Sequence, residues 1–101
     1  MERIVKLLSN IPPRIIKLKA YQNFFTMVWC SRKTAELRSE DDISYFNGDI
    51  LYLCETDENN YTGRVIIAQV VGVFRDVRFL QPGYAMLSIK VLARYENSVM
   101  I

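Results

Sequence analysis

The chain has 101 residues and a net charge of +2, which suffices for one small domain but does not by itself indicate nucleic-acid binding. Half of the residues are hydrophobic and 24% are charged, a balance typical of a folded domain with its own core. The chain contains no histidine, which excludes Ser-His-Asp and Cys-His catalysis, histidine general bases and most zinc sites.

Metal and cofactor sites are not expected from the remaining residues. Cys30 and Cys54 are far apart and do not form a Cys-x-x-Cys pair, so they cannot build a metal site alone. The adjacent acids at 41–42 and 57–58 lack the spacing of an EF-hand loop. We therefore expect no metal and no cofactor.

The N-terminal residues and the lengths of the apolar runs indicate where in the cell the protein is expected. The run Met1–Leu8 carries charges inside its apolar residues and has no cleavage site, unlike a signal peptide. No apolar run approaches the roughly 20 residues that a membrane span needs. The sequence thus predicts a cytoplasmic protein with reduced cysteines and no membrane association.

The chain begins with a predicted lead-in segment, residues 1–13, because the break at Asn10–Pro13 interrupts any regular pattern. A strand is predicted over Arg14–Lys19, where aliphatic and β-branched residues suit the pleat.

Apolar residues then recur at helical spacing and predict an amphipathic helix over Ala20–Cys30. The apolar face consists of Tyr21, Phe24, Phe25, Val28 and Trp29. Because this spacing points them all at one body, we expect core packing rather than a stacking platform. Trp29, near the helix end, is the best candidate for an exception.

The stretch Ser31–Arg38 alternates and predicts a strand over Lys33–Arg38. One side would carry Thr34, Glu36 and Arg38, and the other Lys33, Ala35 and Leu37. Lys33 and Glu36 would then point to opposite faces, unless the strand contains a bulge or begins after Lys33. Spacing alone favours a solvated strand face, although an arginine paired with Glu36 also offers a planar fork for phosphate or a base edge.

Basic residues cluster in the first third of the chain. Acidic residues lie among them and reduce the positive charge that would attract a phosphate backbone. The basic residues are Arg14, Lys17, Lys19, Arg32, Lys33 and Arg38. Sequence alone favours a soluble surface of mixed charge.

The second half predicts strands separated by turns. The strands are expected over Ile50–Glu55, Arg64–Phe74 and Tyr84–Tyr95. Asn47–Asp49 is a turn signal, Asp57–Gly63 is predicted as a polar hairpin loop, and Gly72 marks a bulge or a barrel corner. One helix followed by several strands predicts an α+β domain with a mostly antiparallel, curled sheet. This domain is expected over residues 14–95, followed by a tail, 96–101.

Several segments together resemble a known family. The run Ser31–Arg38 resembles the Gly-x-Lys-x-x-Glu-x-Arg signature of the ASCH domain, with Ser31 where the family usually has glycine. Asn47–Leu51 resembles the family's Gly-Asp turn and following strand. Tyr61–Arg64 and Gly83–Ile89 resemble the hairpin exit and last strand of a small ASCH-like family of unknown function, common in phages and bacterial mobile elements. The likeness covers about residues 14–90.

The resemblance implies a PUA-like β-barrel, with one main amphipathic helix packed against it and a cleft beside the signature. It implies that Lys33, Glu36 and Arg38 line this cleft and that the domain acts on RNA, nucleotides or modified bases. Thr34 and Tyr61 complete the set of candidate ligand-binding residues.

The chain departs from the enzymes that it resembles. Some small ASCH proteins hydrolyse acylated cytidine with a lysine, a threonine three residues later and a more distant glutamate. Lys33 matches the lysine, but Glu36 stands at the threonine's position and Thr34 comes only one residue after the lysine. Lys33 and Glu36 are therefore only weak catalytic candidates.

Three functions remain open. The first is a binding module in which Lys33, Glu36 and Arg38 hold a nucleotide or base, and an aromatic ring such as Tyr45, Phe46 or Tyr61 stacks on it. The second is a hydrolase of a modified nucleoside or of RNA that uses Lys33 and Glu36. The third is a phage-derived interaction protein that binds a host factor.

Overall fold

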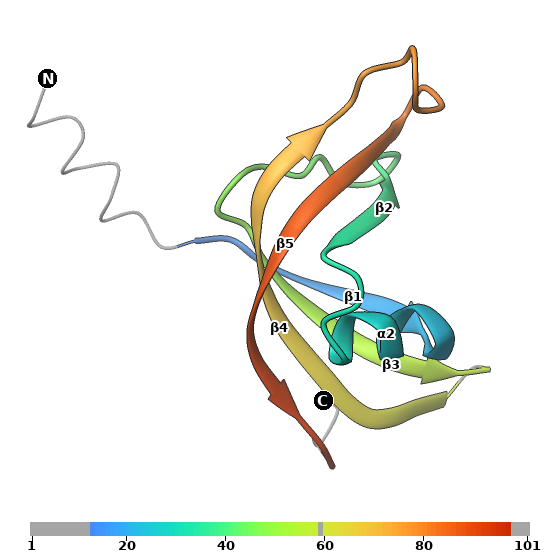
Figure 1. Ribbon diagram of the computed structural model, residues 1–101, viewed down its shortest axis with the longest axis vertical. Helices are drawn as coiled ribbons and strands as arrows, with labels where there is room; N and C mark the ends of the chain where they lie inside the picture. The colour runs from blue at the N-terminus through green and yellow to red at the C-terminus, as the bar shows by residue number, and fades with distance from the viewer. Residues whose placement is uncertain (1–12, 59, 98–101) are drawn as a thin grey trace, which may run out of the picture.

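The computed structural model describes residues 13–58 and 60–97, so nearly all of the expected lead-in segment and most of the expected tail lie outside the described residues. The described elements are β1 (Ile15–Tyr21), α2 (Gln22–Trp29), β2 (Ala35–Ser39), β3 (Ile50–Asp57), β4 (Asn60–Phe74) and β5 (Tyr84–Tyr95), as Figure 1 shows.

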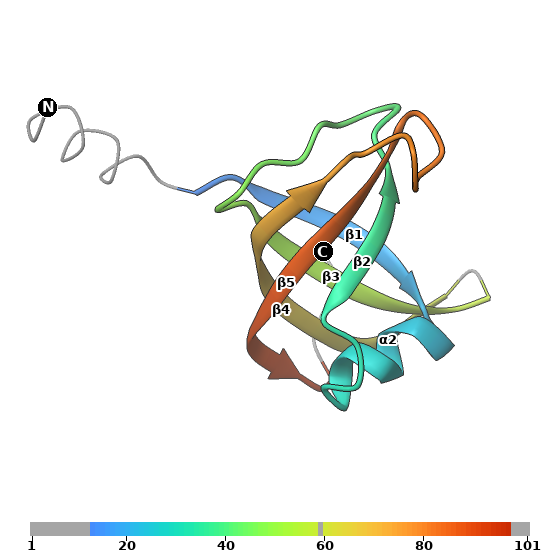
Figure 2. The ribbon, with the colours of Figure 1, turned by 45° about the horizontal axis from the view of Figure 1, so that its top comes forward.

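The strands form one five-stranded sheet in the order β1-β3-β4-β5-β2. The β1–β3 pair is parallel, and the β3–β4, β4–β5 and β5–β2 pairs are antiparallel. The sheet curls into a half-barrel, which brings the two edge strands, β1 and β2, toward each other (Figure 2). The predicted α+β class and the mostly antiparallel, curled sheet are confirmed. We call the gap between β1 and β2 the seam.

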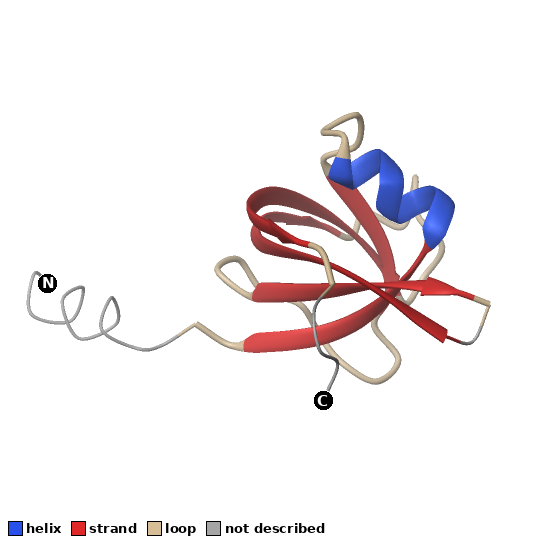
Figure 3. Cartoon of the chain, turned by 90° about the horizontal axis from the view of Figure 1, so that it is seen from below, coloured by secondary structure: helices blue, strands red, loops and turns tan. Residues whose placement is uncertain are grey.

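The concave face of the sheet carries the core. Its buried residues come from every strand except β2, from α2 and from the loop after β2: Ile16, Ala20, Phe25, Val28, Tyr45, Leu51, Leu53, Ile66, Ala68, Val70, Ala85, Leu87 and Ile89. Period-2 alternation on β1 places Ile16, Leu18 and Ala20 inward and Lys17 and Lys19 outward. The helix packs against β1 and β3 and covers one side of the curl (Figure 3).

The helix is shorter than predicted and exposes part of its apolar face. It spans eight residues, with Tyr21 as an extended N-cap residue and Cys30 as its C-cap. Only Phe25 and Val28 are fully buried; Trp29 packs partly buried against the core, whereas Tyr21 and Phe24 are 67% and 50% exposed. The expectation of core packing was therefore wrong for these two rings, and Trp29 is not the exception. An eight-residue helix offers one narrow stripe to the sheet, and Tyr21 precedes the helix.

Two turns position the β3 strand. Gly48, with φ +94°, permits the predicted turn before β3, where an L side chain would be strained. Asp49 accepts hydrogen bonds from the backbone N–H of Phe46 and from the guanidinium of Arg14, so a nearly buried carboxylate holds the turn against the start of β1.

The β3–β4 hairpin is tighter than predicted. Strand β3 continues to Asp57 and β4 begins at Asn60, so Asn60 and Tyr61 pair with β3, and Thr62 and Gly63 lie within β4 at a register shift instead of in a loop. Glu58 takes a positive φ of 54° at the turn, which lets a short connection reverse the chain. The predicted bulge is confirmed, since the β4–β5 register shifts between Val70 and Gly72.

Candidate functional site at the seam

The inward face of β2 is polar, which makes this edge unlike the other strands. Glu36 lies opposite Leu87 and Arg38 opposite Ala85 in the β2–β5 ladder, and directly paired residues share one face of a sheet. Leu87 and Ala85 are fully buried, and Glu36 is only 4% exposed. The interpretation of this stretch as a solvated strand face is therefore wrong for Glu36.

Lys33 and Glu36 meet because β2 starts later than predicted. The strand begins at Ala35, so Lys33 lies in the connection from α2 and is not bound to the strand's alternation. Its Nζ donates to Oε1 of Glu36 at 3.0 Å. Of the two arrangements that would let these residues point together, a bulge or a strand that starts after Lys33, the structure has the second.

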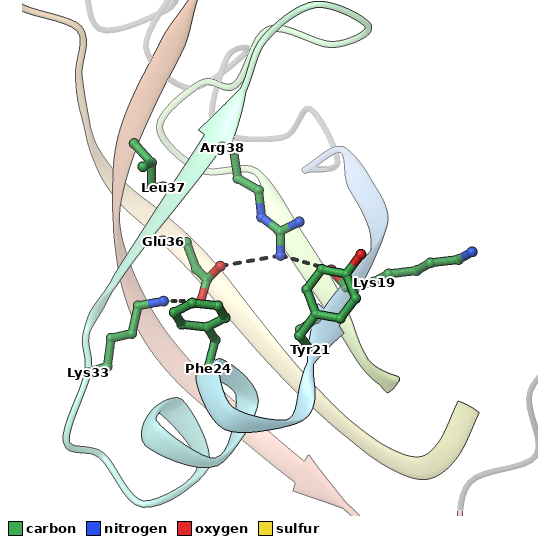
Figure 4. A pocket seen from close by; sticks show the side chains of 8 residues that line it. Lys19, Tyr21, Phe24, Lys33, Glu36, Leu37 and Arg38 are labelled. Carbon is green, nitrogen blue, oxygen red and sulfur yellow. Dashed lines mark hydrogen bonds and ion pairs between the residues drawn. The ribbon is translucent and has the colours of Figure 1, made fainter. Parts of the chain in front are cut away.

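Arg38 bridges the seam. Its Nη2 donates to the backbone oxygen of Lys19 on β1 at 3.1 Å and lies 3.3 Å from Oε2 of Glu36 (Figure 4). Its Nε is buried and has no hydrogen-bond partner among the residues that the structure describes. One carboxylate therefore lies between two cations, and a guanidinium links the two edge strands.

A pocket of about 300 Å³ opens beside these charges, within the range of small-molecule sites. It is lined by Lys19, Ala20, Tyr21, Phe24, Lys33, Glu36, Leu37 and Arg38. The residues come from β1, the start of α2, the connection after α2 and β2, so the pocket exists only because the curl brings the two edges of the sheet together (Figures 2 and 4).

The exposed rings of Tyr21 and Phe24 belong to this pocket. Lys33 Nζ lies 5.1 Å from the centroid of the Phe24 ring, within cation–π range. Figure 4 shows the Phe24 ring beside the Lys33–Glu36 pair and the Tyr21 ring on the β1 side of the pocket. The aromatic residues expected in the core instead supply part of the wall of the site.

The remaining candidate residues lie elsewhere. Thr34 is exposed and is not among the lining residues of the pocket. Tyr61 lies at the start of β4, 40% exposed, with Lys17 Nζ 5.4 Å from its ring centroid.

The other two rings proposed to stack on a base also lie outside the pocket. Tyr45 is only 3% exposed and belongs to the core, so it is not available to stack on a ligand. Phe46 is exposed under Arg14, outside the seam pocket.

A buried ion pair supports the helix that carries Phe24. Arg64 on β4 donates through Nε to Oε1 of Glu55 at 2.9 Å and through Nη2 to Oε2 of Glu55 and to the Thr26 hydroxyl on α2. Its guanidinium also lies 4.9 Å from the ring centroid of Trp29. The hydrogen bonds from Arg64 lower the pKa of Glu55, against the opposing effect of burial. This cluster joins β3, β4 and α2.

Metal ligands do not converge in the part of the chain that the structure describes: no three of its His, Cys, Asp and Glu side chains form a group that could hold an ion. The same residues include no helix with the length and apolarity to cross a membrane.

Comparison with known proteins assigns a family. A family model described as "Domain of unknown function (DUF3850)" matches residues 15–89, from the first residue of β1 to the middle of β5 and therefore across the whole seam site. No curated protein matches the chain significantly. The match does not test the resemblance to ASCH and PUA-like domains, which stays a prediction. Because the family model covers well over half of its residues, the chain belongs to the DUF3850 family.

Proposed function

We propose that the seam pocket binds a nucleobase or nucleotide, as the resemblance to ASCH domains implies. The observation that carries this proposal is the meeting of two exposed rings, Tyr21 and Phe24, with the Lys33–Glu36–Arg38 cluster around one pocket. A purely structural ion pair has no need of exposed aromatic neighbours, and scattered exposed rings do not gather at a buried carboxylate.

Each part of the pocket matches a part of a nucleotide. A ring such as Phe24 offers a face on which a base can stack, and such stacking tolerates any base. Lys33 supplies a point charge for phosphate, and Arg38 a planar fork for phosphate or a base edge. Glu36 accepts one contact per carboxylate oxygen from its cations, and each oxygen keeps a second lone pair for an exocyclic amine.

Arg38 adds a more specific argument. Both of its described polar contacts use Nη2, and the buried Nε has no acceptor within the described residues. Buried donors are nearly always satisfied, so an unsatisfied one calls for an explanation. The Nε is enclosed by protein atoms, so a phosphate or carbonyl oxygen supplies the missing acceptor only when the Arg38 side chain turns toward the pocket.

Binding is tested by titrating the purified protein with nucleosides and nucleoside monophosphates in a calorimeter. We expect Phe24→Ala and Lys33→Gln each to weaken binding about tenfold, the scale of one stacking or charged contact. The matched controls are Phe79→Ala and Lys90→Gln, which remove an exposed ring and an exposed lysine outside the pocket lining. Equal affinities in the site variants and their controls, or no binding by the wild type, would falsify the proposal.

The same titration separates binding from turnover. The 3.0 Å contact between Lys33 Nζ and Glu36 Oε1 favours hydrolysis of an acylated nucleoside as a second candidate. If the protein is such a hydrolase, wild type releases the deacylated nucleoside from an acylated panel and Glu36→Gln does not. Binding of the panel without product rules the hydrolase out and leaves the binding module.

A further inference from the structure

We propose that the ligand is a single-stranded oligonucleotide which continues from the seam pocket along the outer face of β1 to Tyr61. This inference rests on the proposed function, because the first base occupies the seam pocket. It adds a phosphate subsite at Lys17 and Lys19 and a second base subsite at Tyr61.

The outer face of β1 connects the two subsites. Lys17, Lys19 and Tyr21 alternate with inward residues, and all three are exposed. Side chains two residues apart on one face of a strand are separated by about 7 Å. Figure 4 shows the amine of Lys19 extending away from the seam pocket, toward solvent. The strand therefore presents a row of cation, cation and ring that starts at the pocket wall.

Tyr61 lies on β4, level with Tyr21 and separated from it by β3. Tyr21 pairs with Thr56 on β3, and Thr56 pairs with Tyr61 on β4, so two strand spacings, about 10 Å, separate the backbones of the two tyrosines. The Nζ of Lys17 lies 5.4 Å from the Tyr61 ring centroid, which places both side chains on one face of the sheet. Two exposed rings and two lysines thus share the outer face of the sheet, and the Tyr61 ring reaches Lys17.

The combination of two rings and two lysines on one face of the sheet favours a nucleic-acid strand over an acidic peptide. Single-stranded nucleic acids are held by basic grooves that track the backbone and by aromatic side chains on which bases stack. An acidic peptide would use the lysines and leave both rings without a partner. A lone nucleotide would occupy the seam pocket and leave the Lys17–Tyr61 contact unused.

The positions of nearby acidic side chains favour phosphate at the lysines and a base at Tyr61. Asp57 and Glu58 are exposed at the hairpin turn beside Tyr61, so a phosphate there would be repelled. Glu36 and Glu55 are 4% and 2% exposed and are held by their cations. The lysines of β1 therefore offer the site for phosphate, and Tyr61 the site for a base.

The test compares a mononucleotide with a mixed-sequence RNA hexanucleotide, by calorimetry and by fluorescence anisotropy over a range of salt concentrations. We expect the wild type to bind the hexanucleotide at least about tenfold more tightly, since one more stacked base contributes on that scale. Tyr61→Ala and Lys17→Gln should weaken hexanucleotide binding about tenfold and leave mononucleotide affinity within about twofold. Lys17→Gln should also reduce the salt slope by about 0.7, the loss of one phosphate contact on a single strand.

Controls separate the possible failures. Phe79→Ala and Lys90→Gln serve again as matched variants, and Tyr61→Leu keeps an apolar side chain at the hairpin if Tyr61→Ala unfolds. Equal affinity for both ligands, or hexanucleotide binding that is unchanged in Tyr61→Leu and Lys17→Gln, overturns the extended strand and leaves the seam pocket standing. No binding of either ligand overturns both proposals. Competition by polyglutamate as strong as by RNA identifies an acidic polymer as the ligand and overturns this inference.

Discussion

The backbone angle of Ser31 determines how the chain leaves the helix and enters the candidate site. It follows the helix C-cap with φ +59°, and its N–H donates to the oxygen of Val28 while those of Arg32 and Lys33 donate to Met27. A left-handed residue after the C-cap is the usual end of a helix and is most often glycine. Glycine, which usually begins the signature that this stretch resembles, takes such an angle without a Cβ penalty. The reversal brings Lys33 back toward Glu36.

We predict that Ser31→Gly is more stable than Ser31→Ala by about 1 kcal/mol in urea unfolding, because only glycine takes φ > 0 without a Cβ penalty. Both variants lose the hydrogen bond from Arg94 Nη2 to the Ser31 hydroxyl, so their difference isolates the backbone angle. Equal midpoints for the two variants would contradict a strained left-handed residue here.

The contact of α2 with the sheet depends on the Glu55–Arg64 pair. Glu55 on β3 is almost fully buried, and Arg64 reaches from β4 to Thr26 of α2. The pair is a weak source of net stability if both partners are exchanged, but loss of one partner leaves a buried charge. It therefore serves to hold the helix, and with it Phe24, at the seam.

Low pH should weaken the ion pairs that Glu55 and Glu40 form with their arginines. Hydrogen bonds from Arg64 lower the pKa of Glu55, and those from Arg75 lower the pKa of Glu40. Both carboxylates thus bind protons less readily in the folded chain than in the unfolded chain. Their stabilisation is fully present above the unfolded value near 4.5 and is lost as pH falls through the lower folded values.

We expect the free energy of unfolding to fall as pH drops below about 4.5, and Glu55→Gln to be less stable at pH 7 with a shallower acid slope. Chemical denaturation at a series of pH values measures both. Asp42→Asn, which removes an exposed acid, is the matched control. An acid slope in Glu55→Gln as steep as in wild type would show that Glu55 is not its source.

At the scale of the whole molecule, the sheet is an open half-barrel whose edges lie at the site. β3, β4 and β5 are each paired on two sides, whereas β1 and β2 are each paired on one. The described contact across the seam that uses a backbone group is that of Arg38 with Lys19. The two walls of the pocket are therefore the least restrained parts of the sheet, which suits a site that admits a ligand.

We predict that amide hydrogen exchange is slowest in β3 and β4, near Leu53 and Ile66, and faster in β1 and β2. A nucleotide that binds the seam should slow exchange in both edge strands together. Protection of β2 equal to that of β4 without ligand would indicate that the half-barrel is closed in solution.

Much of the fold follows from local patterns. The β-branched runs of β1, β3 and β4 and the Asn47–Gly48 turn determine strand and turn types locally, and β5 was predicted with its observed bounds. The stretch Ser31–Arg38 was identifiable as a charged strand, but its spacing alone favoured a solvated face, and only the resemblance to ASCH domains implied a cleft there.

Other features depend on how the elements meet. Period-2 alternation predicted that Lys33 and Glu36 diverge, and they meet because the left-handed Ser31 delays the start of β2. Helical periodicity marked Tyr21 and Phe24 as core, since it reports which side chains share a face but not how wide a stripe the sheet can cover. The sequence did contain one indication of this. Phe24 and Phe25 are adjacent, so their rings point about 100° apart on a helix and cannot both face the core directly.

The chain by itself therefore determined its strands, its helix and the residues of a polar edge, because these follow from local backbone preferences and burial periodicity. Only the tertiary structure decided that this edge faces β1 across a seam, that two aromatic rings wall the pocket and that Arg38 links its sides. These features arise from the curl of the sheet, which brings together residues that no local pattern relates.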